Sequence, residues 1–208
     1  MPNTALAAAA AEVARRDKVM ARLMKRTDPF RLPRPSHDHF AALAESILYQ
    51  QLAGAAAAAI HRRFVALFDG DLSPKTVLAL SPRKIRAAGL SRSKVASIRD
   101  LAAKVADGTV PLARIGRLAD EDVITRLTVV RGIGRWTAEM FLIFQLRRLD
   151  VWPVEDYGVR KGYSLAYGLR DLLTPKQLQA EGERFRPYRT VAAWYCWQAV
   201  HEQRKPRQ

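Results

Sequence analysis

Apolar residues recur at intervals of three and four along almost the whole chain, and no stretch shows sustained alternation with a period of two. The first spacing places apolar side chains on one face of a helix, whereas alternation marks a strand. Between Phe40 and Phe68 the repeat is regular, with an interruption at Gln51–Gly54 that predicts two helices joined by a tight turn. The pattern therefore predicts an all-α fold of about ten helices.

Capping signals and prolines predict the ends of these helices. Three prolines make residues 27–35 an extended connection, because proline lacks an N–H group and restricts its predecessor. Ser73 and Ser81 each precede a proline, which is the usual start of a helix. The expected helices lie at residues 5–26, from Ser36 or His37 to Phe68 with one break, after Ser73 and Ser81, from Ser91 or Ser93 to 106, and at 120–130, 135–148, 156–168, 175–184 and 189–203.

The composition narrows the class of protein. The 208 residues are 49% hydrophobic, which predicts a packed globular chain, and the net charge of +15 favours a polyanion such as nucleic acid as partner. Cys196 is the single cysteine, so this chain alone can form neither a disulfide nor an iron–sulfur cluster, and a reducing compartment is expected. No apolar run reaches the roughly 18–20 residues that span a membrane. We expect an intracellular protein, either cytoplasmic and nucleoid-associated or nuclear.

The segment at residues 127–139, LTVVRGIGRWTAE, carries the most specific signal. Gly132 and Gly134 flank Ile133 between two predicted helices. Glycine permits a positive φ and the close approach of another backbone, and the free N–H groups at a helix N-terminus suit a phosphate. The alternative is an ordinary helix–helix turn with a glycine cap.

Residues 127–139 resemble the helix-hairpin-helix motif of the DNA glycosylase superfamily. The stretch from Arg135 to Asp156 resembles its alkylpurine branch, the 3-methyladenine DNA glycosylase II group, in a compact form. Further matching segments lie at 47–53, 89–94, 153–157 and 185–197, so the resemblance covers roughly residues 36–203. It implies one glycosylase domain over residues 1–208. Within it we expect a helical barrel subdomain at about 36–150, a second helical subdomain formed by 1–35 and 151–208, and a cleft between them.

Asp156 stands where this family places its catalytic aspartate, twenty residues after Trp136 and just before a predicted helix. An aspartate at a helix N-terminus is stabilised as the anion by free N–H groups and the helix dipole. Such an anion stabilises the positive charge that develops on a deoxyribose when its glycosidic bond breaks. Without the resemblance, a plain N-cap would be the favoured interpretation, and Glu155 is the local competitor.

Trp136 occupies the position at which bifunctional members of the family carry a Schiff-base lysine. The resemblance therefore implies a monofunctional hydrolase of base excision repair without lyase activity. It would remove alkylated purines of the 3-methyladenine and 7-methylguanine type from duplex DNA, act as a monomer and require no cofactor.

An aromatic pocket would suit such a base, because a purine alkylated at N3 or N7 carries a positive charge that aromatic faces attract. Some members of the family have a tyrosine where this chain has Met140, so the substrate preference stays open. The alternative is a core role, since Trp194 and Trp197 lie three residues apart on one helix face. The residues assigned to the base pocket are Trp136, Met140, Trp194, Tyr195 and Trp197.

The resemblance also implies contacts with DNA. Leu52, beside Gln51, stands where the family inserts a side chain into the gap left by the extruded base, although a core leucine is the alternative. Phosphates would be held by the hairpin around Gly132 and Gly134. The side chains expected to help are Arg131, Arg135 and Lys94, with Arg92 near the Gly89 turn.

Backbone carbonyls of the family's hairpin hold a Na⁺ or K⁺ ion that bridges to a DNA phosphate. By position, these would be the carbonyls of Thr128, Val130 and Ile133.

Two other functions stay open: a non-catalytic helix-hairpin-helix module that binds damaged or branched DNA, and a glycosylase for deaminated or etheno purines.

Overall fold

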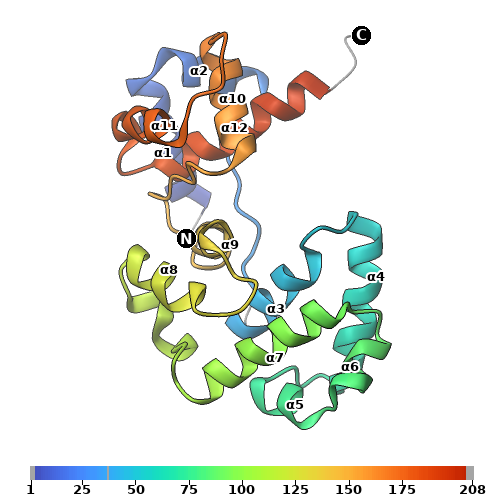
Figure 1. Cartoon of the computed structure of the whole chain (residues 1–208). Helices are drawn as coiled ribbons and strands as arrows, with labels where there is room; N and C mark the ends of the chain where they lie inside the picture. The colour runs from blue at the N-terminus through green and yellow to red at the C-terminus, as the bar shows by residue number, and fades with distance from the viewer. Residues whose placement is uncertain (1–2, 37, 205–208) are drawn as a thin grey trace. The chain divides into compact units, whose positions relative to one another are not determined.

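The computed structural model describes residues 3–36 and 38–204, and these ranges contain helices and loops but no strand (Figure 1). The predicted all-α class is confirmed. Within these ranges, no helix combines the length and the apolar character needed to cross a membrane. Contacts divide the chain into two units: unit 2 spans Pro35–Leu146, and unit 1 takes in the described residues up to Arg34 and from Arg147 onward. The sequence placed these divisions near residues 35 and 150.

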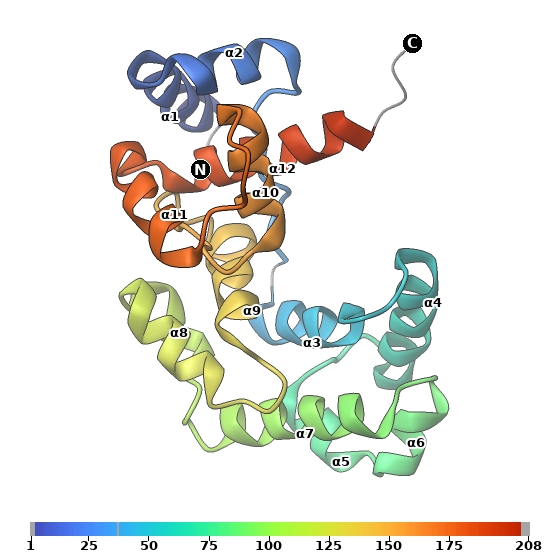
Figure 2. The ribbon, with the colours of Figure 1, turned by 45° about the horizontal axis from the view of Figure 1, so that its top comes forward.

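Unit 2 is built around one long helix, α7. The helices α3, α5 and α6 all pack against α7, and α8 packs against α9 (Figure 2). Ile98 and Leu101 of α7 are fully buried, as are Leu43 and Ile47 of α3. The elements of unit 2 are α3 (His39–Tyr49), α4 (Gly54–Val65), η1 (Ala66–Phe68), α5 (Pro74–Ala79), α6 (Pro82–Ala87), α7 (Arg92–Ala106), η2 (Leu112–Arg117), α8 (Asp120–Thr128), α9 (Arg135–Met140) and η3 (Phe141–Gln145).

Unit 1 is organised by the crossing of α10 and α12, which both views show side by side (Figures 1 and 2). A Cβ atom on Gly162 of α10 would lie 1.8 Å from the carbonyl oxygen of Cys196 in α12, so glycine is what allows the two backbones to touch. Met20 and Leu23 of α2 are buried, and α2 packs on both helices. The elements of unit 1 are α1 (Asn3–Arg16), α2 (Lys18–Arg26), α10 (Tyr157–Tyr167), α11 (Pro175–Gly182), η4 (Glu183–Phe185) and α12 (Arg189–Arg204).

Two of the expected helices differ from the structure. The helix predicted at 5–26 breaks at Asp17, whose carboxylate accepts the N–H groups of Val19 and Met20 and so starts a new helix. Aspartate competes with the helix backbone for such bonds, and this local effect overrides the helix-forming neighbours. The helix predicted at 135–148 is α-helical only to Met140, continues as a π-helix to Gln145, and is followed by a left-handed residue, Arg147, at φ 57°.

Smaller differences lie at other helix ends. Helix α3 is capped by Asp38, whose carboxylate accepts the N–H groups of Phe40 and Ala41, so the helix begins slightly later than the expected start near Ser36 or His37. The alternative start, His37, lies outside the described residues. Helix α8 ends at Thr128, two residues before the predicted end. The 3₁₀ segment η2 was not predicted, because six residues carry too little periodicity to be recognised.

Candidate active site and DNA-binding surface

The hairpin connects α8 to α9 through a turn at residues 129–134. Gly132 adopts a φ of 79°, and a Cβ atom there would lie 2.8 Å from the hydroxyl oxygen of Ser97, so a larger residue would be both strained and crowded. Ile133 is buried beneath the turn. Gly134 is the N-cap of α9, and no side chain caps this helix end. The arrangement leaves the first N–H groups of α9 without a capping side chain, as a phosphate-binding turn requires.

Two polar side chains fix the hairpin turn from neighbouring helices. Asp100 of α7 accepts a hydrogen bond from the backbone N–H of Arg131 at 2.7 Å. It also forms an ion pair with Lys104 at 2.5 Å. Burial opposes the charged form of Asp100, but these two hydrogen bonds prevail and lower its pKa below the ordinary value. On the other side, the amide of Gln50 donates to the carbonyl oxygen of Gly132 at 2.9 Å. The turn is therefore preorganised before any ligand arrives.

The two hairpin arginines have different surroundings. The guanidinium of Arg135 donates to Glu121 at 2.5 and 3.0 Å and to Glu139 at 3.1 Å, so it ties α8 to α9. A phosphate contact by Arg135 stays a prediction and would compete with Glu121. The side chain of Arg131 is exposed and forms no hydrogen bond or ion pair within the described residues. Arg131 is accordingly the better placed of the two for a phosphate.

The predicted cation ligands are the carbonyls of Thr128, Val130 and Ile133 on this turn. Thr128 is the last residue of α8, and the N–H of Ile133 donates to the carbonyl of Val130 at 3.0 Å. A carbonyl at a helix end lacks an intrahelical donor, and a carbonyl that accepts one bond keeps a second lone pair. The carbonyl oxygens of Thr128 and Val130 therefore fit an alkali cation chemically, and the ion and the part of Ile133 stay predictions.

The turn between α3 and α4 carries the predicted wedge. Leu52 is 39% exposed, so its side chain is accessible, and Gln51 adopts a φ of 58°, which a residue other than glycine rarely adopts. A pocket of about 240 Å³ separates this turn from the segment that begins α7. Wedge insertion by Leu52 stays a prediction, and its exposure is compatible with that role.

Lys94 holds this turn. Its ammonium donates to the carbonyls of Leu48 at 2.6 Å and Gln50 at 2.8 Å, and these satisfy the C-terminal end of α3. Burial lowers the pKa of Lys94. The sequence suggested Lys94 only as a phosphate contact. That contact stays a prediction, whereas the structure gives the side chain a positioning role that only the folded chain reveals.

Asp156 is the N-cap of α10 in unit 1. Its Oδ1 atom accepts the backbone N–H of Val159 at 2.8 Å and the indole N–H of Trp197 at 2.9 Å. Both partners are donors, so they hold an ionised carboxylate in a fixed direction. Asp156 is half-buried, whereas its neighbour Glu155 is exposed and is not the cap. Of the two acids, Asp156 has the surroundings of a preorganised functional group.

Gly158 makes the approach of Trp197 to Asp156 sterically feasible. A Cβ atom at Gly158 would lie 2.8 Å from Cδ1 of Trp197 and 3.0 Å from the Asp156 Oδ1 atom. With Gly162 one turn later, it forms the smooth face of α10 on which α12 lies. These two glycines were not among the residues predicted from the sequence. Their spacing of four within a predicted helix is the signal that could have identified them.

The predicted base-pocket residues fall into two groups. Trp136 is 45% exposed on α9 and Met140 follows one turn later, both in unit 2. Trp194, Tyr195 and Trp197 belong to α12 in unit 1. A base pocket formed by residues of both units stays a prediction.

Within unit 1, two of these aromatics pack against the segment that follows α2. Trp194 makes edge contacts with Phe30 and Tyr195, at ring centroid distances of 5.8 and 4.8 Å. Tyr195 is only 2% exposed, and its hydroxyl accepts the backbone N–H of Phe30. These contacts give Tyr195 a core role, which sequence reasoning had kept as the alternative for this aromatic cluster. Trp197, bonded to Asp156, is the aromatic that the structure joins to the candidate carboxylate.

Comparisons with known proteins identify the family to which the chain belongs. Residues 44–187 match the sequence profile of the family described as HhH-GPD superfamily base excision DNA repair protein. DNA-3-methyladenine glycosylase 1 of Schizosaccharomyces pombe is 34% identical over 186 residues, which cover 87% of this chain and 82% of the yeast protein.

Two solved structures resemble the fold closely. The Schizosaccharomyces pombe 3-methyladenine DNA glycosylase in complex with abasic DNA superposes with a TM-score of 0.80 at 34% identity, covering 91% of this chain and 94% of the other. A DNA-3-methyladenine glycosidase from Bacillus halodurans gives a TM-score of 0.82 at 34% identity, covering 90% and 87%. The similarity therefore extends over both units.

Proposed function

The chain belongs to the HhH-GPD superfamily of base excision DNA repair proteins, and from this premise we propose that it is a monofunctional DNA glycosylase that removes alkylated purines from duplex DNA. Membership of the family makes it a base excision DNA glycosylase. The alkylpurine specificity and the absence of lyase activity are the steps that we add. The observation that supports the glycosylase chemistry is Asp156, held by a helix N-terminus and the Trp197 indole. Tryptophan at position 136 supports the absence of lyase activity, and similarity to DNA-3-methyladenine glycosylases supports the alkylpurine specificity.

The chemistry follows from the charge of the substrate. A purine alkylated at N3 or N7 is cationic, so when its glycosidic bond breaks, the bonding electrons leave with the base, which departs neutral. The deoxyribose keeps the positive charge at C1′. The ionised carboxylate of Asp156 stabilises this charge, and water then adds to C1′ and loses a proton to the carboxylate or to solvent. The products are the free base and an abasic site.

The remaining predicted groups deliver the base to this carboxylate. The hairpin N–H groups and Arg131 bind phosphates, which sets the register on the duplex without reading sequence. A cation on the carbonyls of Thr128, Val130 and Ile133 would add a positive charge at the same phosphate. Leu52 fills the gap in the stack, which offsets part of the few kcal/mol that base extrusion costs.

Trp136 argues against a covalent mechanism. An indole nitrogen is not a nucleophile toward a sugar C1′, whereas a lysine amine forms a Schiff base and supports strand cleavage. Trp136 is 45% exposed on the first turn of α9, where its ring can contact DNA or the base. A base contact there would favour cationic purines, by about 0.5–2 kcal/mol.

The test is release of bases from duplexes that each carry one lesion: 3-methyladenine, 7-methylguanine, hypoxanthine or ethenoadenine. We expect release of the two methylated bases, intact strands until the abasic site is cleaved by alkali, and no adduct after borohydride reduction. A borohydride-trapped complex would contradict the monofunctional mechanism. Release confined to hypoxanthine or ethenoadenine would contradict the proposed specificity.

A further inference from the structure

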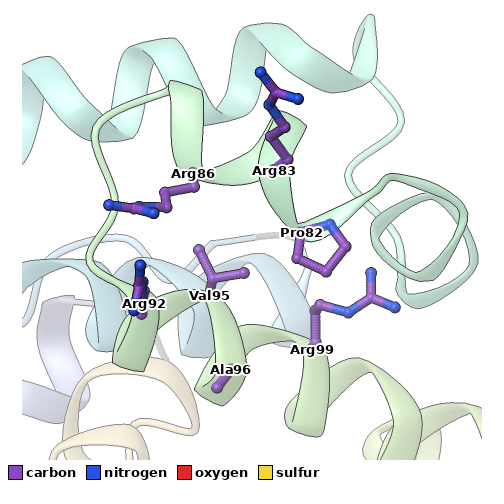
Figure 3. A pocket seen from close by; sticks show the side chains of 7 residues that line it. All are labelled: Pro82, Arg83, Arg86, Arg92, Val95, Ala96 and Arg99. Carbon is purple, nitrogen blue, oxygen red and sulfur yellow. The ribbon is translucent and has the colours of Figure 1, made fainter.

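A pocket rich in arginine lies between α6 and α7 in unit 2 (Figure 3). It has a volume of about 520 Å³, and its apolar lining comes from Pro82, Val95 and Ala96. Figure 3 shows Arg86 of α6 and Arg92 of α7 on one side of the pocket, and Pro82 and Arg99 on the opposite side. The four arginines that line this arginine pocket are Arg83, Arg86, Arg92 and Arg99.

These arginines differ in what they bind. The guanidinium of Arg99 donates to the carbonyls of Val77 at 3.2 Å and Leu80 at 2.7 Å, so it is fixed against the end of α5. The side chains of Arg83, Arg86 and Arg92 are exposed and form no hydrogen bond or ion pair within the described residues. No carboxylate lines the pocket. Positively charged side chains around one pocket repel one another, and a bound anion offsets this repulsion.

The geometry of α7 separates this pocket from the hairpin. Helical residues are spaced by about 100°, so Arg92, Val95, Ala96 and Arg99 share one face. The hairpin contacts a different face, through Ser97 beside Gly132 and Asp100 beneath Arg131. The arginine pocket therefore lies on another face of α7 than the hairpin contacts, and it includes Arg92, which was expected from the sequence to contact a phosphate near the Gly89 turn.

The chemistry of the site points to phosphate groups. Guanidinium groups bind phosphate through paired N–H donors, and they keep their charge at any physiological pH. The pocket lining includes no aromatic side chain of the kind that anchors most protein–protein interfaces. Helix α7 is 15 residues long, about 22 Å, whereas duplex DNA rises about 3.4 Å per base pair. A duplex bound at the hairpin needs only about seven base pairs to span that length.

We propose that the arginine pocket is a second phosphate-binding site, separate from the hairpin, that binds the backbone of undamaged DNA. The inference rests on the proposed function in one respect, because it takes DNA as the polyanion. Such a site adds affinity that does not depend on sequence or lesion. It would keep the enzyme on undamaged duplex between lesions.

The test is the salt dependence of binding to an undamaged, fluorescently labelled 24-base-pair duplex. The double variant Arg86→Gln/Arg92→Gln removes two charges from the pocket. The control Arg114→Gln/Arg117→Gln removes two exposed charges from η2 in the same unit, and these also form no hydrogen bond or ion pair within the described chain. Each lost phosphate contact should reduce the slope of log K against log salt by about 1.

For the pocket variant, we expect the slope of log K against log salt to be smaller in magnitude by about 2, equally on damaged and undamaged duplexes. The control should keep the wild-type slope. An unchanged slope in the pocket variant would overturn the proposal, as would an equal loss in the control, which would indicate net charge alone. Base release by the wild type is measured in parallel. If no base is released but the slopes differ as expected, the proposed function fails and the phosphate site stands.

Discussion

At Asp156, a backbone N–H and an indole N–H converge on one carboxylate oxygen. Orientation matters there, because a carboxylate fixed before the reaction stabilises the developing charge without reorganising. The sequence predicted both Asp156 and Trp197 as functional residues. It could not predict the bond between them, because they lie 41 residues apart and meet only where Gly158 lets α12 approach α10.

Replacing Trp197 with phenylalanine tests this bond. The ring stays and the N–H donor is lost, so we expect kcat for base release to fall about 10- to 100-fold, the kinetic equivalent of the roughly 1.5–3 kcal/mol of a hydrogen bond to a charged group. Single-turnover kinetics at saturating DNA measure the effect.

The matched control is Trp152→Phe, which also removes an indole N–H donor in unit 1. Trp152 donates to the carbonyl of Leu178 in the core. We expect this control to lower the melting temperature and to leave kcat close to the wild-type value. Equal kcat losses in both variants would show that the Trp197 bond serves stability alone.

Among the elements, the turn between α3 and α4 is held by a residue from another helix. Lys94 reaches it from α7, and Gln50 joins it to the hairpin, so the wedge and the hairpin form one connected surface of unit 2. Replacing Lys94 with methionine leaves two carbonyls without their donor. We expect kcat for base release to fall by about tenfold, since the turn that carries Leu52 loosens.

The control for Lys94→Met is Lys84→Met, which removes an exposed lysine charge on α6. The variants Leu52→Ala and Lys94→Met/Leu52→Ala complete the set. If Lys94 acts through the wedge, the double variant releases bases no more slowly than Leu52→Ala. Independent, multiplicative losses would contradict the positioning role.

The elements also show what sequence can and cannot predict. The Ser–Pro starts of α5 and α6 were predicted, because a capping side chain and a proline act within one turn, and Ser91, one of the two expected starts of α7, is its cap. The early end of α9, its π-helical continuation and the left-handed Arg147 were not. Arg147 donates to the carbonyl of Pro33, 114 residues earlier, and such long-range contacts leave no local pattern.

At the scale of the whole molecule, the two units contribute different parts of the proposed chemistry. Unit 2 contains the hairpin, the wedge turn and the arginine pocket, and unit 1 contains Asp156 and Trp197. The net charge of +15 was the first indication of a nucleic-acid partner, and the hairpin motif narrowed it to DNA repair. The positioning role of Lys94 and the meeting of arginines from α6 and α7 appeared only in the folded chain, because both depend on how separate helices pack.

The central claim is that Asp156 is the catalytic carboxylate. The measurement is release of N-methylpurines from alkylated duplex DNA by the wild type and by Asp156→Asn, with duplex affinity measured for both. Asparagine can still accept the two N–H bonds but carries no charge, so we predict a loss of release on the order of 10²-fold or more with affinity retained. Release at the wild-type rate by Asp156→Asn would contradict the account.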